Sequence, residues 1–264
     1  MNLGLQGKRA LVSGSTAGIG FAIARSLALE GAAVVVNGRD PARVDAAVLA
    51  VRKAAPDAEV RGIVADVGGA EGCAQLVEAC PEVDVLVNSA GLFEPKAFGD
   101  IPDGDWLRFF EVNVLSGVRL SRSYLPGMLA RDWGRIVFIS SESALQIPPE
   151  MIHYGATKTA QLAVARGLAE TTRGTAVTVN AVLPGPTRSE GVGAFMKALA
   201  SQENRTLEVY EKEFFLHARP SSILQRFLDP QEVAALVVFV ASGLASGVNG
   251  AALRVDGGVV RAIV

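Results

Sequence analysis

Tyr154 and Lys158 lie at positions i and i+4, a spacing at which a phenol and an ammonium group can cooperate in proton transfer. On a helix, residues with this spacing share one face. The pKa of a free phenol is about 10, and a nearby ammonium group lowers it because the positive charge favours the phenolate. Ser141 follows the apolar run 136–139, which is typical of a buried strand, so its hydroxyl is expected near that of Tyr154. Taken alone, the same residues also fit an exposed Tyr, an exposed Lys and a Ser in a turn.

A glycine-rich turn near the start of the chain offers a second chemical feature. The apolar run 9–13 leads into a loop with Gly14, Gly18 and Gly20, and residues 21–28 then have a helical period. Strand, glycine turn and helix are the context of a dinucleotide-binding loop. Glycine lets the backbone approach a pyrophosphate at the helix N-terminus, where free N–H groups and the macrodipole favour anions. The glycine spacing departs from the usual Gly-x-Gly-x-x-Gly, so the loop alone is weak evidence.

Strand and helix patterns alternate along the chain that must position these residues. Strands are expected at 9–13, 33–37, 59–65, 83–87, 135–140, 176–182 and 250–255. Helices are expected at 21–28, 42–54, 71–79, 105–130, around 154–171 and at 230–240. This alternation predicts βαβ units, and therefore an α/β, Rossmann-type doubly wound sheet of about seven parallel strands with helices on both faces. No composition break or repeat divides the chain, so residues 1–264 are interpreted as a single domain.

The candidate polar groups all follow the ends of predicted strands. In sheets of this kind, ligands bind beyond the carboxyl ends of the strands. Scattered structural residues would not be expected to collect at one edge. The groups concerned are 14–20, Arg39, Asp66, 88–91, Ser141 and 184–187.

Composition limits the classes of function. The net charge of -2 gives no global attraction to nucleic acid or to an anionic membrane. No apolar run approaches the roughly 20 residues that span a bilayer, and the start has no signal-peptide core. Cys73 and Cys80 match neither a disulfide framework nor a CxxC motif, so structural thiols and a reducing cytoplasm are expected. The histidines, His153 and His217, have no paired Cys/His cluster beside them, and no metal site is expected.

With these motifs in order, the chain resembles the short-chain dehydrogenase/reductase family over essentially its whole length. The family's glycine motif is similar to 13–20, with Ser13 where Thr is usual. Its Asn-Asn-Ala-Gly motif is similar to 88–91, where Ser89 replaces an amide, and its Pro-Gly motif is similar to 184–185. Members described as 3-oxoacyl-carrier-protein reductases and as gluconate dehydrogenases look similar, but the family acts on many substrates.

The resemblance implies hydride transfer between a nicotinamide C4 and a carbonyl or secondary alcohol carbon. The catalytic tetrad of the family carries over onto Asn113, Ser141, Tyr154 and Lys158. Tyr154 would exchange a proton with the substrate oxygen, and Ser141 would hydrogen-bond that oxygen. Lys158 would lower the pKa of Tyr154 and bind the nicotinamide ribose. Asn113 would hold a water that links Lys158 to solvent, or brace a kinked helix, or do both.

The resemblance also implies cofactor contacts at the strand ends. Asp66 fits an adenine contact and a helix N-cap equally well, and Asn88 fits either a contact or a bridge between strands. The expected cofactor-binding residues are Gly14, Ser15, Thr16, Gly18, Ile19, Gly20, Arg39, Asp66, Val67, Asn88, Ala90, Gly91, Tyr154, Lys158, Pro184, Gly185 and Thr187.

NADP(H) is the predicted cofactor, with NAD(H) as the alternative. NAD-binding sheets usually place an acidic residue after the second strand, where this chain has Asn37 and Gly38. Arg39 can donate a charge-assisted contact to a 2′-phosphate. Against this, Arg39 paired only with Asp40 would leave NAD(H) equally good, and Ala17 stands where NADP-binding relatives often have a second basic residue.

Other interpretations concern the periphery of the site. Residues 188–228 form a helical but irregular insertion that is expected to act as a substrate lid over an apolar substrate, although its large apolar residues also fit ordinary packing. These residues are Phe195, Met196, Phe214 and Phe215. The expected partners are a small carbonyl or alcohol substrate and further copies of the chain, in a homotetramer or dimer. The expected subunit contacts are Trp106, Phe109, Phe110 and the tail 259–264, although the three aromatic residues also fit the core. A cofactor-binding regulator and a non-redox epimerase or dehydratase are the alternatives.

Overall fold

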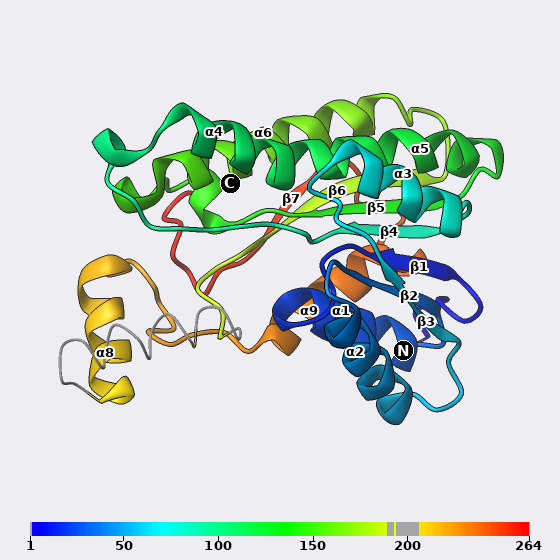
Figure 1. The fold of residues 1–264 in the computed structure, drawn as a ribbon, viewed down its shortest axis with the longest axis horizontal. Coiled ribbons are helices and arrows are strands. Elements are labelled where there is room, and N and C mark those ends of the chain that lie inside the picture. Colours follow the sequence, from blue (N-terminus) through cyan, green and yellow to red (C-terminus); the bar gives the residue numbers. More distant parts are fainter. Residues whose placement is uncertain (1, 189–192, 194–205, 264) are drawn as a thin grey trace.

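Strands that are covered on both faces have nearly continuous runs of apolar residues. The central strands of this chain are buried in this way, whereas the edge strand Val60–Val64 is largely exposed. In the computed structural model, which describes residues 2–188, 193 and 206–263, the strands form one parallel sheet in the order β3-β2-β1-β4-β5-β6-β7 (Figure 1). The strands are β1 (Arg9–Val12), β2 (Ala33–Gly38), β3 (Val60–Val64), β4 (Val85–Asn88), β5 (Gly134–Ile139), β6 (Val177–Pro184) and β7 (Ala252–Val255). The predicted doubly wound sheet is confirmed.

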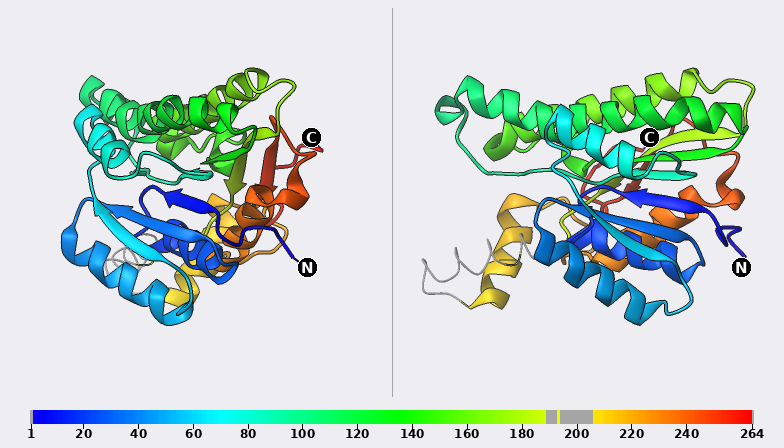
Figure 2. Two further views of the ribbon diagram at one scale, coloured as in Figure 1. Left: turned by 90° about the vertical axis from the view of Figure 1, so that its right-hand side faces the viewer. Right: turned by 45° about the vertical axis from the view of Figure 1, so that its right-hand side comes forward.

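Helices cover both faces of this sheet, and the two views of Figure 2 show a helical layer on either side of it. One layer holds α1 (Gly18–Leu29), α2 (Pro41–Ala54) and α9 (Pro230–Ala241). The other holds α3 (Ala70–Ala79), α4 (Asp103–Phe110), α5 (Ser116–Ala130) and α6 (Ile152–Glu170). Each layer has its own core because side chains alternate along a strand. In β1, Ala10 and Val12 join the core beneath α1 and α9, whereas Leu11 joins the core beneath α3 and α5.

The predicted helix 105–130 is helical throughout but changes its winding midway. Between α4 and α5 lies a π-helical segment, η2 (Glu111–Leu115), which contains Asn113. Wide turns of this kind are often found at functional sites. The other short elements are the 3₁₀ turns η1 (Phe98–Asp100), η3 (Glu142–Ala144), η4 (Pro149–Met151) and η6 (Gly243–Ala245).

The predicted insertion begins where β6 ends. Its described part holds α8 (Leu207–Glu213) and a π-helical segment, η5 (Phe214–Ala218), and then runs irregularly to α9. Its two ends meet, since Thr187 pairs with Leu228 as a parallel bridge and the amide of Arg188 donates to the carbonyl of Leu228 at 2.8 Å. Phe195 and Met196 lie outside the described residues.

The two cysteines are free and buried, as the sequence predicts. Burial raises the pKa of both thiols, so they are held as neutral, unreactive side chains. The thiol of Cys73 lies 3.3 Å from the carbonyl of Val67, to which it donates. Within the described residues, no helix is long and apolar enough to cross a membrane.

Candidate active site

The glycine loop between β1 and α1 presents backbone groups that suit a phosphate. The N-cap residue of α1, Ala17, has no side chain that can cap the helix, so the first N–H groups of α1 have no side-chain partner. Gly14 has φ 62°, and a Cβ there would lie 2.8 Å from the Cα of Ala90. A Cβ on Gly20 would lie 2.4 Å from the carbonyl oxygen of Gly14. The close packing of backbone on backbone therefore requires glycine here.

Side chains at the end of β1 lock this loop in place. The hydroxyl of Ser13 accepts from the amides of Ser89 (3.0 Å) and Ala90 (3.1 Å), so the segment after β4 is tied to the glycine loop. Asn37 accepts from the amide of Gly14 at 3.3 Å and donates to the carbonyl of Ala65 at 3.1 Å. The bracing role of Asn37 was not predicted. A polar residue inside a buried strand is the signal that could have shown it.

A cavity of about 290 Å³ lies beside this loop, at the carboxyl ends of β1 to β4. Arg39, just before α2, and Arg43, in its first turn, both line it, and Arg43 was not predicted. Asp40 lines it too, but its carboxylate caps α2 by accepting from the amide of Arg43 at 3.0 Å. The predicted cofactor residues in its wall are Gly14, Thr16, Arg39, Asp66, Val67, Ala90 and Gly91. Backbone donors, two guanidinium groups and glycine contacts fit the phosphates and ribose of a dinucleotide.

Two predicted cofactor residues had competing interpretations. The carboxylate of Asp66 accepts from the amide of Gly68 at 3.0 Å, whereas the N-cap of α3 is Gly69, so the N-cap interpretation of Asp66 is wrong. Asp66 is exposed and lines the cavity. Asn88 is buried and donates to the hydroxyl of Ser121 at 3.2 Å, so it joins β4 to α5 rather than one strand to another. The side chain of Asn88 is thus directed away from the cavity.

A second cavity, of about 420 Å³, adjoins the catalytic candidates. Tyr154 and Ser141 line it together, which brings the end of β5 and the start of α6 to one point. Its remaining wall is mostly apolar. The predicted cofactor residues in this wall are Ile19, Tyr154, Pro184, Gly185 and Thr187. Of the predicted site residues, Ser15, Gly18, Gly20, Asn88, Asn113 and Lys158 line neither cavity.

The environment of Tyr154 raises the pKa of its phenol. Burial is the main cause, and the negative charge of Glu142 adds to it, whereas the hydrogen bond with Ser141 and the charge of Arg219 lower the pKa by less. Lys158 is not among the groups that shift this pKa, so its expected lowering of the Tyr154 pKa stays a prediction. The ammonium group of Lys158 lies 5.6 Å from the centroid of the Tyr154 ring and donates elsewhere. The phenol is therefore held in its protonated form.

Lys158 is buried behind the tyrosine in a short polar chain. Its Nζ donates to the carbonyl of Ile139 at 2.9 Å and to Oε1 of Gln161 at 3.2 Å, and Nε2 of Gln161 donates to the carbonyl of Asn113 at 2.6 Å. Burial lowers the pKa of Lys158 to about 8. Gln161 was not predicted, although it lies one helical turn beyond Lys158. A Cβ on Gly91 would lie 3.6 Å from this Nζ, so Gly91 separates the lysine from the first cavity.

Asn113 is fully buried and braces the helix in which it lies. Its Oδ1 accepts from the amide of Leu92 at 2.7 Å, and its Nδ2 donates to the carbonyl of Leu92 at 3.1 Å and to Oγ1 of Thr157 at 3.0 Å. These contacts match the bracing interpretation of Asn113. They tie the loop after β4, the π-helical segment and α6 together behind the two cavities.

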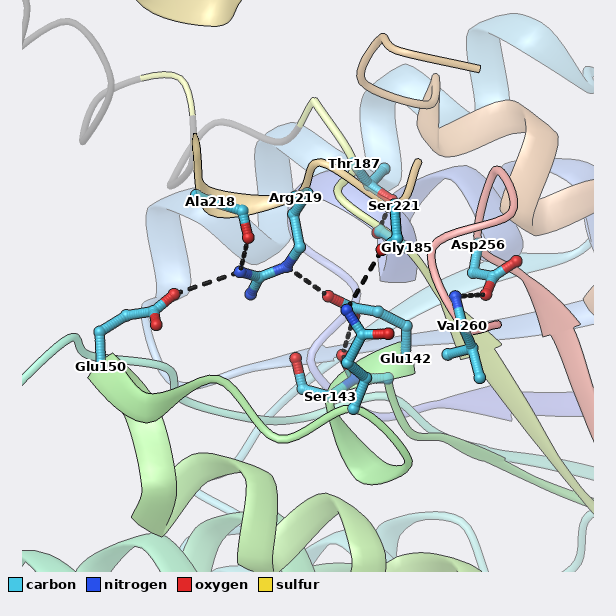
Figure 3. A network of polar contacts seen from close by, with 12 residues as sticks. Glu142, Ser143, Glu150, Gly185, Thr187, Ala218, Arg219, Ser221, Asp256 and Val260 are labelled. Carbon is cyan, nitrogen blue, oxygen red and sulfur yellow. Dashed lines mark hydrogen bonds and ion pairs between the residues drawn. The ribbon is translucent and has the colours of Figure 1, made fainter. Parts of the chain in front are cut away.

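A buried ion-pair network forms one wall of the second cavity (Figure 3). Oε2 of Glu142 accepts from the hydroxyl of Ser141 at 2.5 Å, and Oε1 accepts from Nε of Arg219 at 3.1 Å. Nη1 of Arg219 donates to Oε1 of Glu150 at 3.2 Å and to the carbonyl of Ala218 at 2.8 Å. The side chains of Arg219 and Glu142 are only 8% and 6% exposed. Neither residue was predicted as part of the site.

Aromatic residues of the insertion complete the cavity. Phe214 stacks on Phe227 with ring centroids 5.0 Å apart, and both line the cavity. Phe215 is buried against both rings, as ordinary packing requires. The guanidinium carbon of Arg219 lies 5.8 Å from the centroid of the Phe214 ring, which helps to fix its position.

Comparisons with known proteins agree with this geometry. A family model described as enoyl-(acyl carrier protein) reductase matches residues 14–260. The chain is 51% identical over 263 residues to the uncharacterized oxidoreductase YvaG of Bacillus subtilis, covering all of both chains. It is 35% identical to a D-beta-hydroxybutyrate dehydrogenase of Cupriavidus necator, covering 96% of this chain and 98% of that protein.

Among solved structures, L-sorbose reductase from Gluconobacter frateurii, complexed with NADPH and L-sorbose, superposes with a TM-score of 0.94. The two chains are 30% identical, and the match covers all of both. The two cavities of this chain fit a nicotinamide dinucleotide and a small substrate side by side. The chain belongs to the short-chain dehydrogenase/reductase family and is an oxidoreductase that uses a nicotinamide cofactor.

Proposed function

We propose that this protein is an NADP(H)-dependent reductase of small ketones, with Tyr154 as its proton donor. The observation that carries the proposal is the meeting of Tyr154 and Ser141 in a cavity whose wall also holds Ile19, Gly185 and Thr187. The phenol of Tyr154 carries its proton at neutral pH, and this is the form that a proton donor in ketone reduction needs.

In this reaction the bound cofactor supplies a hydride, and the carbonyl carbon of the substrate accepts it. Tyr154 donates its phenolic proton to the carbonyl oxygen, so the ketone gains two electrons and two hydrogens and becomes a secondary alcohol. Ser141 donates its single proton to Glu142 in this structure, so it stabilises the charge that develops on the same oxygen only after its hydroxyl turns from Glu142 to the substrate. Lys158 uses two of its three N–H groups on Ile139 and Gln161, which leaves one for a ribose hydroxyl of the cofactor.

NADP(H) is proposed over NAD(H) because of the charges at the end of β2. Arg39 and Arg43 line the first cavity, and the carboxylate of Asp40 is occupied as the cap of α2. A 2′-phosphate would lie near two cations there. Positions Asn37 and Gly38 have no carboxylate that could accept a hydrogen bond from the 2′-hydroxyl of NAD(H). The NADPH bound by the L-sorbose reductase supports the same choice.

We also propose that the protein is a homotetramer and that residues 206–228 cover the substrate. The apolar side chains of Leu107, Phe110 and Leu115 are 71%, 37% and 37% exposed, more apolar surface than a monomer usually presents in one place. Phe214, Arg219 and Phe227 support the covering role, since all three line the second cavity. Light scattering at micromolar concentration tests the assembly, and a monomer would contradict it. A cytoplasmic location stays a prediction.

The experiment is oxidation of NADPH by a panel of ketones, with the wild type and Tyr154→Phe. The variant is expected to lose about 10²–10⁴-fold in kcat, the usual contribution of a general acid, while its Kd for NADPH stays nearly unchanged. Tyr124→Phe is the matched control, because the Tyr124 hydroxyl donates to the carbonyl of Cys80, away from both cavities. A kcat of Tyr154→Phe within a few-fold of the wild type would rule out Tyr154 as the acid. Absence of any NADPH oxidation would favour a regulator or a non-redox enzyme.

A further inference from the structure

We infer that Arg219 binds the substrate and selects neutral ketones that carry a second oxygen, a hydroxyl or a carbonyl, near the reacting carbon and on the side of the cavity where Arg219 lies. The inference rests on the proposed function, because it names the substrate class of the same cavity. It also gives a negative rule: ketones that carry a carboxylate in this place are poor substrates.

The first argument is an unused hydrogen-bond donor in a buried place. Among the described residues, Nε and Nη1 of Arg219 have partners, but its other terminal nitrogen, Nη2, has none. In Figure 3 this nitrogen has no dashed line. Arg219 is 7% exposed and lines the second cavity together with Tyr154. Its third nitrogen is therefore available to an acceptor that enters the cavity.

The second argument concerns position. Ser141, Glu142 and Arg219 form a connected row along the cavity wall, joined at 2.5 and 3.1 Å. From Ser141 to Arg219 this row crosses one carboxyl group and two hydrogen bonds. Arg219 and Tyr154 line the same small cavity, so a second oxygen on a carbon near the reacting one can accept from Nη2 while the carbonyl oxygen accepts from Tyr154. Stacking against Phe214 and the contacts to two glutamates hold the guanidinium group in place beforehand.

The third argument concerns charge. The single cation, Arg219, is paired with two carboxylates, those of Glu142 and Glu150, so the network is negative overall. A substrate carboxylate would lose its water in an apolar cavity and meet Glu142 next to the guanidinium group, and both effects disfavour binding. A neutral hydroxyl or carbonyl oxygen accepts from Nη2 without these penalties. The rest of the wall, with Phe93 and Met151, suits an apolar substrate body.

Three ketones of the same length provide the test: hexane-2,3-dione, hexan-2-one and 2-oxohexanoate, each measured as kcat/KM with NADPH. The wild type is expected to favour the dione over both others by about tenfold to a hundredfold, the value of one hydrogen bond to a charged group. In Arg219→Met the ratio of dione to hexan-2-one should fall about tenfold. Because this ratio is taken within one protein sample, partial misfolding does not affect it. Arg226→Met is the control, since Arg226 belongs to the same segment but pairs with Glu232 at the surface.

Glu150→Gln tests the charge argument without touching Ser141. It removes one of the two negative charges on Arg219, so the relative kcat/KM for 2-oxohexanoate should rise in this variant. A wild type that prefers 2-oxohexanoate, or a dione preference that survives in Arg219→Met, would overturn the inference while the proposed reductase stands. If none of the three ketones oxidises NADPH, the proposed function fails and the inference fails with it.

Discussion

The geometry of the glycine loop predicts that Gly14→Ala lowers the free energy of unfolding. Two separate effects act at this position. Its φ of 62° lies in the left-handed region, where a residue with a Cβ loses roughly 1–2 kcal/mol. In addition, the new Cβ would lie 2.8 Å from the Cα of Ala90, a backbone atom that cannot rotate away. Ser13 accepts a hydrogen bond from the amide of Ala90, and Asn37 accepts one from the amide of Gly14, so neither backbone segment can move away easily.

Overpacking of this kind typically destabilises a protein by about 1–3 kcal/mol. The expected loss for Gly14→Ala is therefore about 2–5 kcal/mol in the free energy of unfolding. Gly174→Ala separates the two effects, because Gly174 has φ 79° but no atom within 4 Å of its Cβ position. It should lose only about 1–2 kcal/mol. Gly167→Ala lies inside α6, also without neighbours, and should gain roughly 0.5–1 kcal/mol.

Urea unfolding of the wild type and the three variants measures these differences, and the KM for NADPH reports on the loop itself. We expect the KM to rise in Gly14→Ala alone, because only this substitution displaces the backbone that faces the first cavity. If Gly14→Ala is no less stable than Gly174→Ala, the contact with Ala90 is not tight and the account of the loop is wrong. An unchanged KM in a destabilised Gly14→Ala variant would separate the loop from cofactor binding.

Two further predictions concern charge. Arg39→Ala should lower kcat/KM for NADPH by about tenfold to a hundredfold and leave kcat/KM for NADH nearly unchanged, since one charge-assisted contact is lost. Arg173→Ala is the control, because the side chain of Arg173 is 85% exposed. Equal losses with both cofactors would contradict the selection of a phosphate by Arg39. Lys158 has a pKa lowered from 10.5 to about 8, so between these pH values the unfolded chain binds the proton more tightly and stability should rise with pH. Lys158→Met should remove this rise, and its stability relative to the wild type should be greatest below about pH 8. Urea unfolding of both proteins across pH 7–11 measures the difference. An identical pH dependence in both proteins would show that Lys158 is not desolvated.

The sheet and the meeting of its polar ends could be predicted because both depend on local patterns. A buried strand and an amphipathic helix are recognised from neighbouring residues alone. Parallel strands then bring their carboxyl ends to one edge without further information, which is why Gly14, Ser141 and Gly185 lie around one site. The same reasoning placed Tyr154 beside Ser141, since the start of α6 follows the end of β5 in the chain.

The ion pair of Arg219 with Glu142 in the wall of the second cavity could not be predicted because it joins residues that are far apart in the sequence. Arg219 reaches Glu142 across 77 positions, from a segment with no regular period. The raised pKa of Tyr154 could not be predicted for a related reason. The spacing puts Lys158 and Tyr154 on one face of α6, but it does not reveal that the ammonium group donates to the carbonyl of Ile139 or that Tyr154 is buried beside Glu142.

The position of Glu142 connects substrate binding with proton transfer. The hydroxyl of Ser141 has a single proton, and the carboxylate of Glu142 at 2.5 Å is a stronger acceptor for it than the phenol oxygen of Tyr154. Glu142 therefore favours a protonated Tyr154 in two ways, through its charge and through its competition for the Ser141 proton. Because Arg219 holds the other oxygen of the same carboxylate, a substrate oxygen that binds Arg219 acts on the group that keeps Tyr154 ready to donate.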